Sequence, residues 1–157
     1  MNTTAPRALS PQPDPARRLI GLLGYGGLIP FAGLALLLWL VTPDLAPWVA
    51  MALSAYAALI ASFLGGIHWG VAWLRMERGQ DHARTHLAWG VVPSLLAWPG
   101  VVMPAYAGLV WLAVVLVVCY LVDRRLYPAA GLSPWLALRF RLSSVAALCC
   151  LIGAGAV

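Results

Sequence analysis

Five apolar segments, separated by short polar stretches, run along the chain. A helix needs about 20 residues to cross the hydrocarbon core of a bilayer, so each segment is long enough to span it or nearly so. A short amphipathic stretch, residues 134–141, precedes the last segment, and we expect it to lie along the membrane interface as a separate helix. The pattern predicts an all-α fold, a polytopic membrane helix bundle of about five transmembrane helices. The segments are residues 19–41, 47–74, 87–103, 105–122 and 142–157.

Composition supports a membrane protein. Hydrophobic residues make up 62% of the chain and charged residues 10%, and the mean hydropathy is +0.87. Ordinary soluble domains have roughly 25% charged residues. Residues 17–157 are therefore predicted to form a single transmembrane domain, with no room for a separate soluble catalytic domain. Residues 1–16 are rich in proline and poor in large apolar side chains, so we expect a disordered N-terminal tail.

The arginines predict the orientation in the membrane. Three of the ten precede the first apolar segment, three lie between the second and third, and four lie between the fourth and fifth. The other two connections have none, so the positive-inside rule places the N-terminus in the cytoplasm and the C-terminus outside. This asymmetry accounts for the net charge of +5, and we expect no nucleic-acid partner.

The predicted location is the bacterial inner (cell) membrane, as a multi-pass protein embedded in the lipid bilayer. The mitochondrial inner membrane is the alternative, because the tail carries arginine and has only Asp14 as an acid, as transit peptides do. The prolines of the tail oppose an amphipathic targeting helix, which favours the bacterial membrane.

The second apolar segment carries a small residue at every fourth position. Helices in lipid associate by close backbone approach, because lipid tails are as apolar as leucine. We therefore expect this row to be the helix-packing face at the centre of the bundle, and Gly66→Leu to lower the amount of folded protein in the membrane. The row consists of Ser54, Ala58, Ser62, Gly66 and Gly70.

Prolines inside the first and third segments predict kinks at Pro30 and Pro93. A proline within a helix frees the carbonyl four residues earlier, which for Pro30 belongs to Gly26. Neighbouring helices have to satisfy such carbonyls, because the hydrocarbon contains no water.

His68 is an ionisable side chain that lies inside an apolar segment rather than at its boundary. At about 1.5 Å of rise per residue, Tyr25, Gly26, Ser94 and Tyr120 lie at a similar depth from the cytoplasmic ends of their segments. We interpret these five residues as a polar layer or binding site, in which His68 faces inward and bonds to the Gly26 carbonyl and a tyrosine hydroxyl. An intramembrane ionisable residue is a functional candidate; a structural and a chemical role both stay open, with the structural one favoured.

The other two histidines, His82 and His86, fall in the polar stretch 75–86, which we expect to lie outside the hydrocarbon. Their spacing of four suits a weak metal site on a helix, with Glu77 and Asp81 nearby, but a solvated loop is the favoured interpretation. A haem within the bilayer would need a second axial ligand, and the other apolar segments contain no histidine. We expect no cofactor, no metal site and no catalytic residue.

Three stretches resemble a known family. They are LGYGGLIPF at 23–31, SFLGGIHWG at 62–70 and WGVVPSLLAW at 89–98, and Asp123 and residues 135–139 extend the likeness over nearly all of the chain after the tail. In these motifs the chain is similar to domain-of-unknown-function family 3429, small inner-membrane proteins that include transmembrane protein 69. The resemblance implies a multi-span protein of the bacterial or mitochondrial inner membrane with no assigned activity.

The sequence favours a protein that is not an enzyme, because no serine, cysteine or carboxylate is placed beside a base for catalysis. The leading hypothesis is an integral membrane protein that acts through helix packing with a membrane partner, in assembly or stabilisation. The alternative is a small-solute transporter or channel that uses the broken first and third segments and His68. A partner protein predicts a small-residue surface that faces lipid, whereas a transporter predicts a polar path accessible from both sides.

Overall fold

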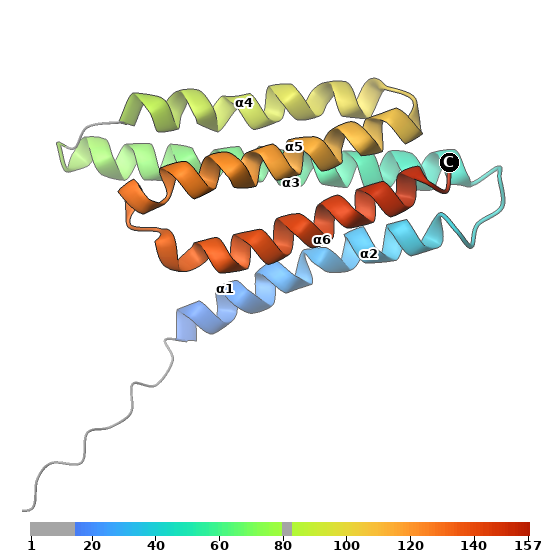
Figure 1. Cartoon of the computed structure of the whole chain (residues 1–157), viewed down its shortest axis with the longest axis horizontal. Coiled ribbons are helices and arrows are strands. Elements are labelled where there is room, and N and C mark those ends of the chain that lie inside the picture. Colours follow the sequence, from blue (N-terminus) through green and yellow to red (C-terminus); the bar gives the residue numbers. More distant parts are fainter. Residues whose placement is uncertain (1–14, 80–82) are drawn as a thin grey trace, which may run out of the picture.

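The computed structural model describes residues 15–79 and 83–157, which form an elongated bundle of antiparallel helices (Figure 1). No strand occurs within these ranges, and the all-α prediction is confirmed. The tail expected at 1–16 lies outside the described residues except for its last two, which begin the first helix. The helices are α1 (Pro15–Gly26), α2 (Leu28–Leu37), α3 (Ala46–Glu77), α4 (Ala83–Val102), α5 (Ala105–Leu126) and α6 (Leu136–Ala154), with 3-10 turns at Pro128–Ala130 and Ser133–Trp135.

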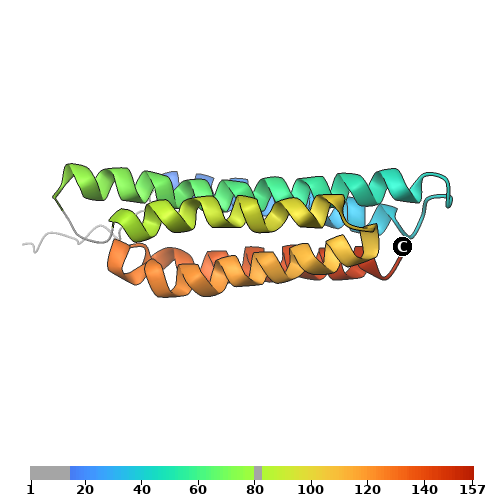
Figure 2. The same cartoon turned by 90° about the horizontal axis from the view of Figure 1, so that it is seen from above.

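The helices have the lengths and apolarity of membrane spans. Four stretches meet both criteria: Pro15–Leu37, Ala46–Glu77, Ala105–Leu126 and Ser133–Ala154. The remaining helix, α4, is less apolar because it carries two prolines, two tryptophans and a histidine. It runs alongside α3 and α5 over nearly its whole length, so it lies in the same layer of the membrane as these two spans (Figure 1 and Figure 2). The chain is thus a multi-pass membrane helix bundle.

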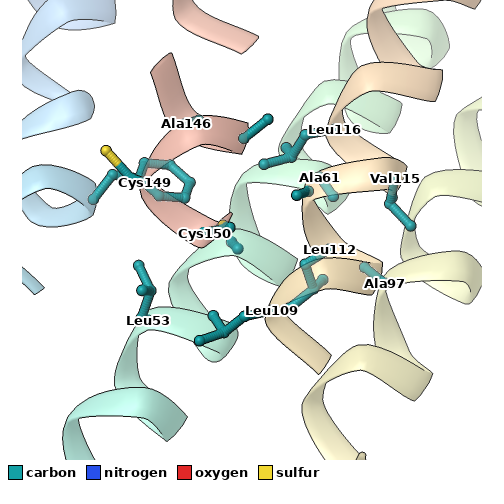
Figure 3. Close-up of a cluster of buried hydrophobic side chains, with 14 of the residues drawn as sticks. Leu53, Ala61, Ala97, Leu109, Leu112, Val115, Leu116, Ala146, Cys149 and Cys150 are labelled. Carbon is teal, nitrogen blue, oxygen red and sulfur yellow. The ribbon is translucent and has the colours of Figure 1, made fainter. Parts of the chain in front are cut away.

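Helix α3 packs against α2, α4, α5 and α6. Its core face meets α5 and α6 in a cluster of leucines, alanines and cysteines (Figure 3). Leu53, Leu109, Leu112 and Cys150 are fully buried there. Alanines such as Ala61 sit among them, so that large side chains of one helix fill the space left by small side chains of another.

The last span begins earlier than predicted. A separate interfacial helix at 134–141 is wrong, because a single helix, α6, continues from Leu136 to Ala154. Arg139, which gave this stretch its amphipathic character, is buried in the bundle beside Asp123. A neutralised arginine can enter the low-dielectric interior, whereas an unpaired one would stay at the interface.

The first span is interrupted at Gly27, three residues before Pro30. The Tyr56 hydroxyl of α3 donates a hydrogen bond to the Gly27 carbonyl at 2.9 Å. The proline ring pushes the preceding turn away, and the exposed carbonyl is satisfied from a neighbouring helix. A break near Pro30 is thus present, but the carbonyl that receives the bond belongs to Gly27 rather than Gly26.

Helix α4 continues through both of its prolines, Pro93 and Pro99, so no interruption marks the kink expected at Pro93. The indole Nε1 of Trp111 in α5 donates to the carbonyl of Leu96, again three residues before a proline, at 2.6 Å. This hydrogen bond therefore connects the turn that Pro99 loosens to α5.

The packing face of α3 differs from the predicted small-residue row. Ser54 is buried, Ala58 and Ser62 are half-buried, and Gly66 is exposed with nothing within 4 Å of a β-carbon built on it. Each step of four residues overshoots a 3.6-residue turn by about 40°, so the row winds away from the core by Gly70. The buried face follows a mean spacing closer to 3.6, through Ala50, Leu53, Ser54, Ala57, Ala61, Leu64, Gly65, His68 and Ala72.

Close backbone approach occurs at Gly65 instead. A β-carbon on Gly65 would lie 2.3 Å from the carbonyl oxygen of Gly90 in α4, and one on Gly90 would lie 2.1 Å from Cδ1 of Trp69. Between α4 and α5, a β-carbon on Gly108 would lie 2.2 Å from the carbonyl oxygen of Gly100. Glycine pairs therefore set the distance between α4 and both of its neighbours.

Adjacent glycines in α3 provide a direct test of this packing. Gly65→Ala should lower the free energy of unfolding by about 1–3 kcal/mol, because the new methyl group forces α3 and α4 apart. Gly66→Ala should be neutral or raise it by up to about 1 kcal/mol, because alanine favours helix where space is open. Unfolding of the two variants in detergent measures both, and shifts of the same sign and size would contradict the packing described.

Candidate functional site

His68 lies at the centre of a buried chain of polar side chains. It is fully buried in α3, between α4 and α5. Its Nε2 lies 2.8 Å from Oδ1 of Asp123 in α5, and its Nδ1 lies 2.9 Å from Nδ1 of His86 in α4. The two imidazole rings are stacked, with centroids 5.2 Å apart. One histidine thus joins three helices.

Arg139 extends the chain to α6. Its Nε donates to Oδ2 of Asp123 at 2.9 Å, its Nη2 donates to the same oxygen, and its Nη1 donates to Oγ of Ser143 at 3.3 Å. The phenol ring of Tyr127, next to the end of α5, lies 5.7 Å from the His68 ring. Burial, with the Asp123 charge second, raises the pKa of Tyr127 to about 12, so its hydroxyl keeps its proton.

Charge balance explains why these groups tolerate burial. Asp123 and Arg139 carry opposite charges in direct contact, and the carboxylate also accepts from His68. An isolated charge in such a medium is penalised by several kcal/mol, a penalty that a well-bonded pair offsets. The pairs also fix the helices relative to one another, since each bond needs its two helices at one rotation and height. We call the five residues His68, His86, Asp123, Arg139 and Ser143 the polar cluster.

The contact between the two Nδ1 atoms holds one proton. Asp123, as a carboxylate, only accepts, so Nε2 of His68 carries hydrogen. If His68 is neutral, its Nδ1 accepts a hydrogen bond from the Nδ1–H of His86; if His68 is doubly protonated, its Nδ1–H donates and Nδ1 of His86 accepts. With protons on both Nδ1 atoms, two donors would face each other at 2.9 Å. When the pair carries one positive charge, this proton can move from one Nδ1 to the other, so that the charge passes between α3 and α4 without a change of partners.

The structure separates the predicted polar layer. Of its five residues only His68 belongs to the polar cluster. Tyr25 is exposed and receives a weak bond from Arg141 at 3.4 Å, Gly26 has open space where a side chain would be, and Tyr120 packs against the Phe140 ring. Ser94 lines a groove between α3 and α4. Residue counts give the depth of a residue along a helix, but the face that it occupies depends on helix rotation, so equal depth does not bring these groups together.

The partners of His68 were the residues that sequence reasoning placed elsewhere. The prediction that His86 belongs to a solvated loop is wrong, since α4 begins at Ala83 and turns His86 inward, where it is 2% exposed. Its expected neighbour His82 lies outside the described residues. Asp123 and Arg139 stand at the edges of apolar segments, where a charged side chain ordinarily faces water. The sequence did contain a signal for a buried ion pair, because Asp123 follows the fourth apolar segment and Arg139 precedes the fifth.

The chemistry that this arrangement offers is hydrogen bonding and proton exchange. In the ranges that the structure describes, no group of three or more histidine, cysteine or acidic residues is placed to hold a metal ion. The polar cluster also occupies one end of the bundle, near the α3–α4 and α5–α6 connections. Beyond it the described core consists of residues such as Leu53, Leu109, Leu112 and Cys150.

The ion pair predicts a non-additive response to mutation. Arg139→Gln should lower the free energy of unfolding by about 3–5 kcal/mol, because it leaves the Asp123 carboxylate buried without its counter-charge. Adding Asp123→Asn should recover part of that loss, since the amide oxygen still accepts from His68 and no charge remains. Detergent unfolding of both single variants and the double variant measures the coupling. A double variant as unstable as the sum of the single ones would contradict the pairing.

Comparison with known proteins agrees with this architecture. The chain matches the family described as "Protein of unknown function (DUF3429)" over residues 16–155. Over 66 residues it is 50% identical to Transmembrane protein 69 of Xenopus tropicalis, a stretch that covers 42% of this chain and 24% of that protein, about a quarter of its length. No solved structure matches the chain. Because the family match takes in all six α-helices of the described residues apart from Pro15, the chain belongs to the DUF3429 family of membrane proteins.

Proposed function

We propose that this protein is a non-catalytic integral membrane protein that binds a transmembrane helix of a different protein, in the assembly or stabilisation of an inner-membrane complex. The observation that carries the proposal is the surface where α3 and α4 meet. There the small residues of α3 turn outward instead of toward the core. The arginine distribution supports the bacterial inner membrane with a cytoplasmic N-terminus, and the mitochondrial inner membrane is the alternative.

The docking surface is a groove with a small-residue extension. Its floor contains Ala58, Ser62, Ser94 and Ala97, and Trp98 flanks it. Gly66 continues the row of α3 with open space above it, and Gly70 does the same one turn further. A second helix can thus lie along α3 at backbone distance over about three turns.

The energetic reason for docking here is the absence of hydrophobic drive in lipid. Helices associate there through van der Waals contact and interhelical hydrogen bonds, each bond worth about 0.6 kcal/mol on average. Lipid chains fill a narrow groove poorly, whereas a helix with complementary side chains fills it well. Ser62 and Ser94 add hydroxyl groups that a partner helix can bond to.

The second candidate is the small-solute transporter or channel, which the proton-sharing His68–His86 contact favours. Transport needs a polar path open to both sides of the membrane. The polar cluster lies at one end of the bundle, and the described core beyond it is apolar. This distribution supports the docking role over transport.

The docking role predicts that filling the groove extension with a larger side chain removes a partner without unfolding the protein. Gly66→Leu should accumulate in native membranes like the parent, because its side chain enters open space, yet capture at least about tenfold less of a partner by crosslinking and pull-down, which corresponds to about 1.4 kcal/mol. Ala137→Leu, the same kind of change at an exposed position of α6, is the matched control and should keep the partner.

Three outcomes would contradict the docking role. They are equal partner capture by Gly66→Leu and the parent, capture of further copies of this chain alone, and reaction of the buried Cys119 and Cys150 with a membrane-impermeant thiol reagent. The last would instead support a water-filled path and hence the transporter.

A further inference from the structure

A cavity lies on another side of the bundle from the docking groove, between residues of α1, α2, α3, α5 and α6. Its volume is about 130 Å³, and its walls are largely apolar, with Leu28, Phe31, Leu64 and Leu142 among them. An engineered cavity of about 150 Å³ in a protein core binds benzene, so this space holds a ring or a short piece of hydrocarbon chain.

The cavity opens toward the bilayer. Leu23 of α1 and Phe63 of α3 line it, and both are about two-thirds exposed on the surface of the bundle. These residues belong to helices that are long and apolar enough to span the membrane, so their exposed faces meet lipid. Gly24 and Gly27 contribute wall without side chains, at the point where α1 and α2 are interrupted. A molecule enters this cavity from the hydrocarbon rather than from water.

One end of the cavity is polar, and it belongs to the polar cluster. Arg139 and Ser143 line it beside apolar neighbours. A guanidinium group has five N–H donors. The hydrogen bonds of Arg139 to Asp123 and Ser143 account for three of them, two of which go to Asp123. An N–H donor is thus left for an oxygen that enters the cavity.

The charge of the site selects a neutral oxygen. Asp123 already neutralises Arg139, so a carboxylate or phosphate in the cavity would add an uncompensated buried charge. A carbonyl oxygen accepts a hydrogen bond without that penalty. The site therefore combines an apolar slot with one donor for a neutral carbonyl.

We propose that this cavity binds a neutral, carbonyl-bearing lipid from the bilayer, whose apolar part occupies the slot and whose carbonyl oxygen accepts from Arg139. Two lipid types share this chemistry, the isoprenoid quinones and the acylglycerol esters. Binding at this site is independent of the docking groove, which lies between α3 and α4.

The test uses the full chain purified in mild detergent, with three added compounds. Decylubiquinone supplies a quinone ring, dioctanoylglycerol supplies ester carbonyls, and decane supplies hydrocarbon alone. At least one carbonyl compound should raise the melting temperature in a saturable way, and decane should raise it less. A shift with the quinone alone assigns the ring, a shift with the glyceride alone assigns the ester, and shifts with both support the shared chemistry.

Two tryptophan variants locate the binding. Leu28→Trp fills the cavity and should weaken binding of the effective compound at least about tenfold, which corresponds to about 1.4 kcal/mol. Leu148→Trp, on an exposed face of α6, should bind like the parent. Both variants must first melt cooperatively without ligand. The proposal is overturned if no carbonyl compound shifts the melting temperature, if decane acts equally, or if Leu28→Trp retains full affinity.

Arg139→Lys tests the polar end, because it preserves the charge beside Asp123 but removes two of the five N–H donors. It should reduce the difference between the carbonyl compound and decane. An unchanged difference would show that Arg139 does not contact the carbonyl, and would overturn that part of the proposal.

Discussion

Asp123 is a carboxylate that the bundle buries, and its neutralisation constrains the helices around it. Arg139 from α6 supplies the counter-charge. His68 from α3 donates a hydrogen bond to the other carboxylate oxygen, and its second ring nitrogen contacts His86 in α4. Such a network adds little net stability relative to a well-packed apolar core, because desolvation offsets the attraction. Its larger effect is on specificity: a rotation of any one helix would leave a buried charge or imidazole without a partner.

Away from the polar cluster, two features hold the bundle together. Helix backbones approach closely at glycines, and side chains donate hydrogen bonds to the carbonyls of turns that prolines loosen. Glycines bring α4 close to α3 and α5, and the carbonyls ahead of Pro30 and Pro99 accept from Tyr56 and Trp111 on neighbouring helices. Each of these two loosened turns thus has a hydrogen bond to a neighbouring helix. Both parts of the bundle meet the same requirement, because polar groups within the lipid need hydrogen-bond partners from the protein itself.

The fold class could be predicted because bilayer thickness fixes the length of a span, and the apolar segments showed that length directly. Helix rotation could not be predicted. The small-residue row through Gly66 winds away from the core face because a spacing of four residues differs from the helical period of 3.6. The predicted polar layer rested on residue counts, which give the depth of a residue along its helix but not the direction in which its side chain points. Asp123, Arg139 and His86 lie at segment ends, where charged residues normally face water. Their contacts with His68 and with one another turn them inward, and contacts across four helices leave no local pattern in the sequence.

The contact between His68 and His86 is the part of the network that spectroscopy can observe most directly. Nitrogen-15 labelling of the histidines, with His82→Gln to simplify the spectrum, allows solid-state NMR of the protein in lipid. We expect the Nδ1 atoms of His68 and His86 to share one proton, with coupling between them across the hydrogen bond, and Nε2 of His68 to carry hydrogen toward Asp123. Separate protons on both Nδ1 atoms, or His86 nitrogens that titrate with the bulk solution independently of His68, would contradict the account.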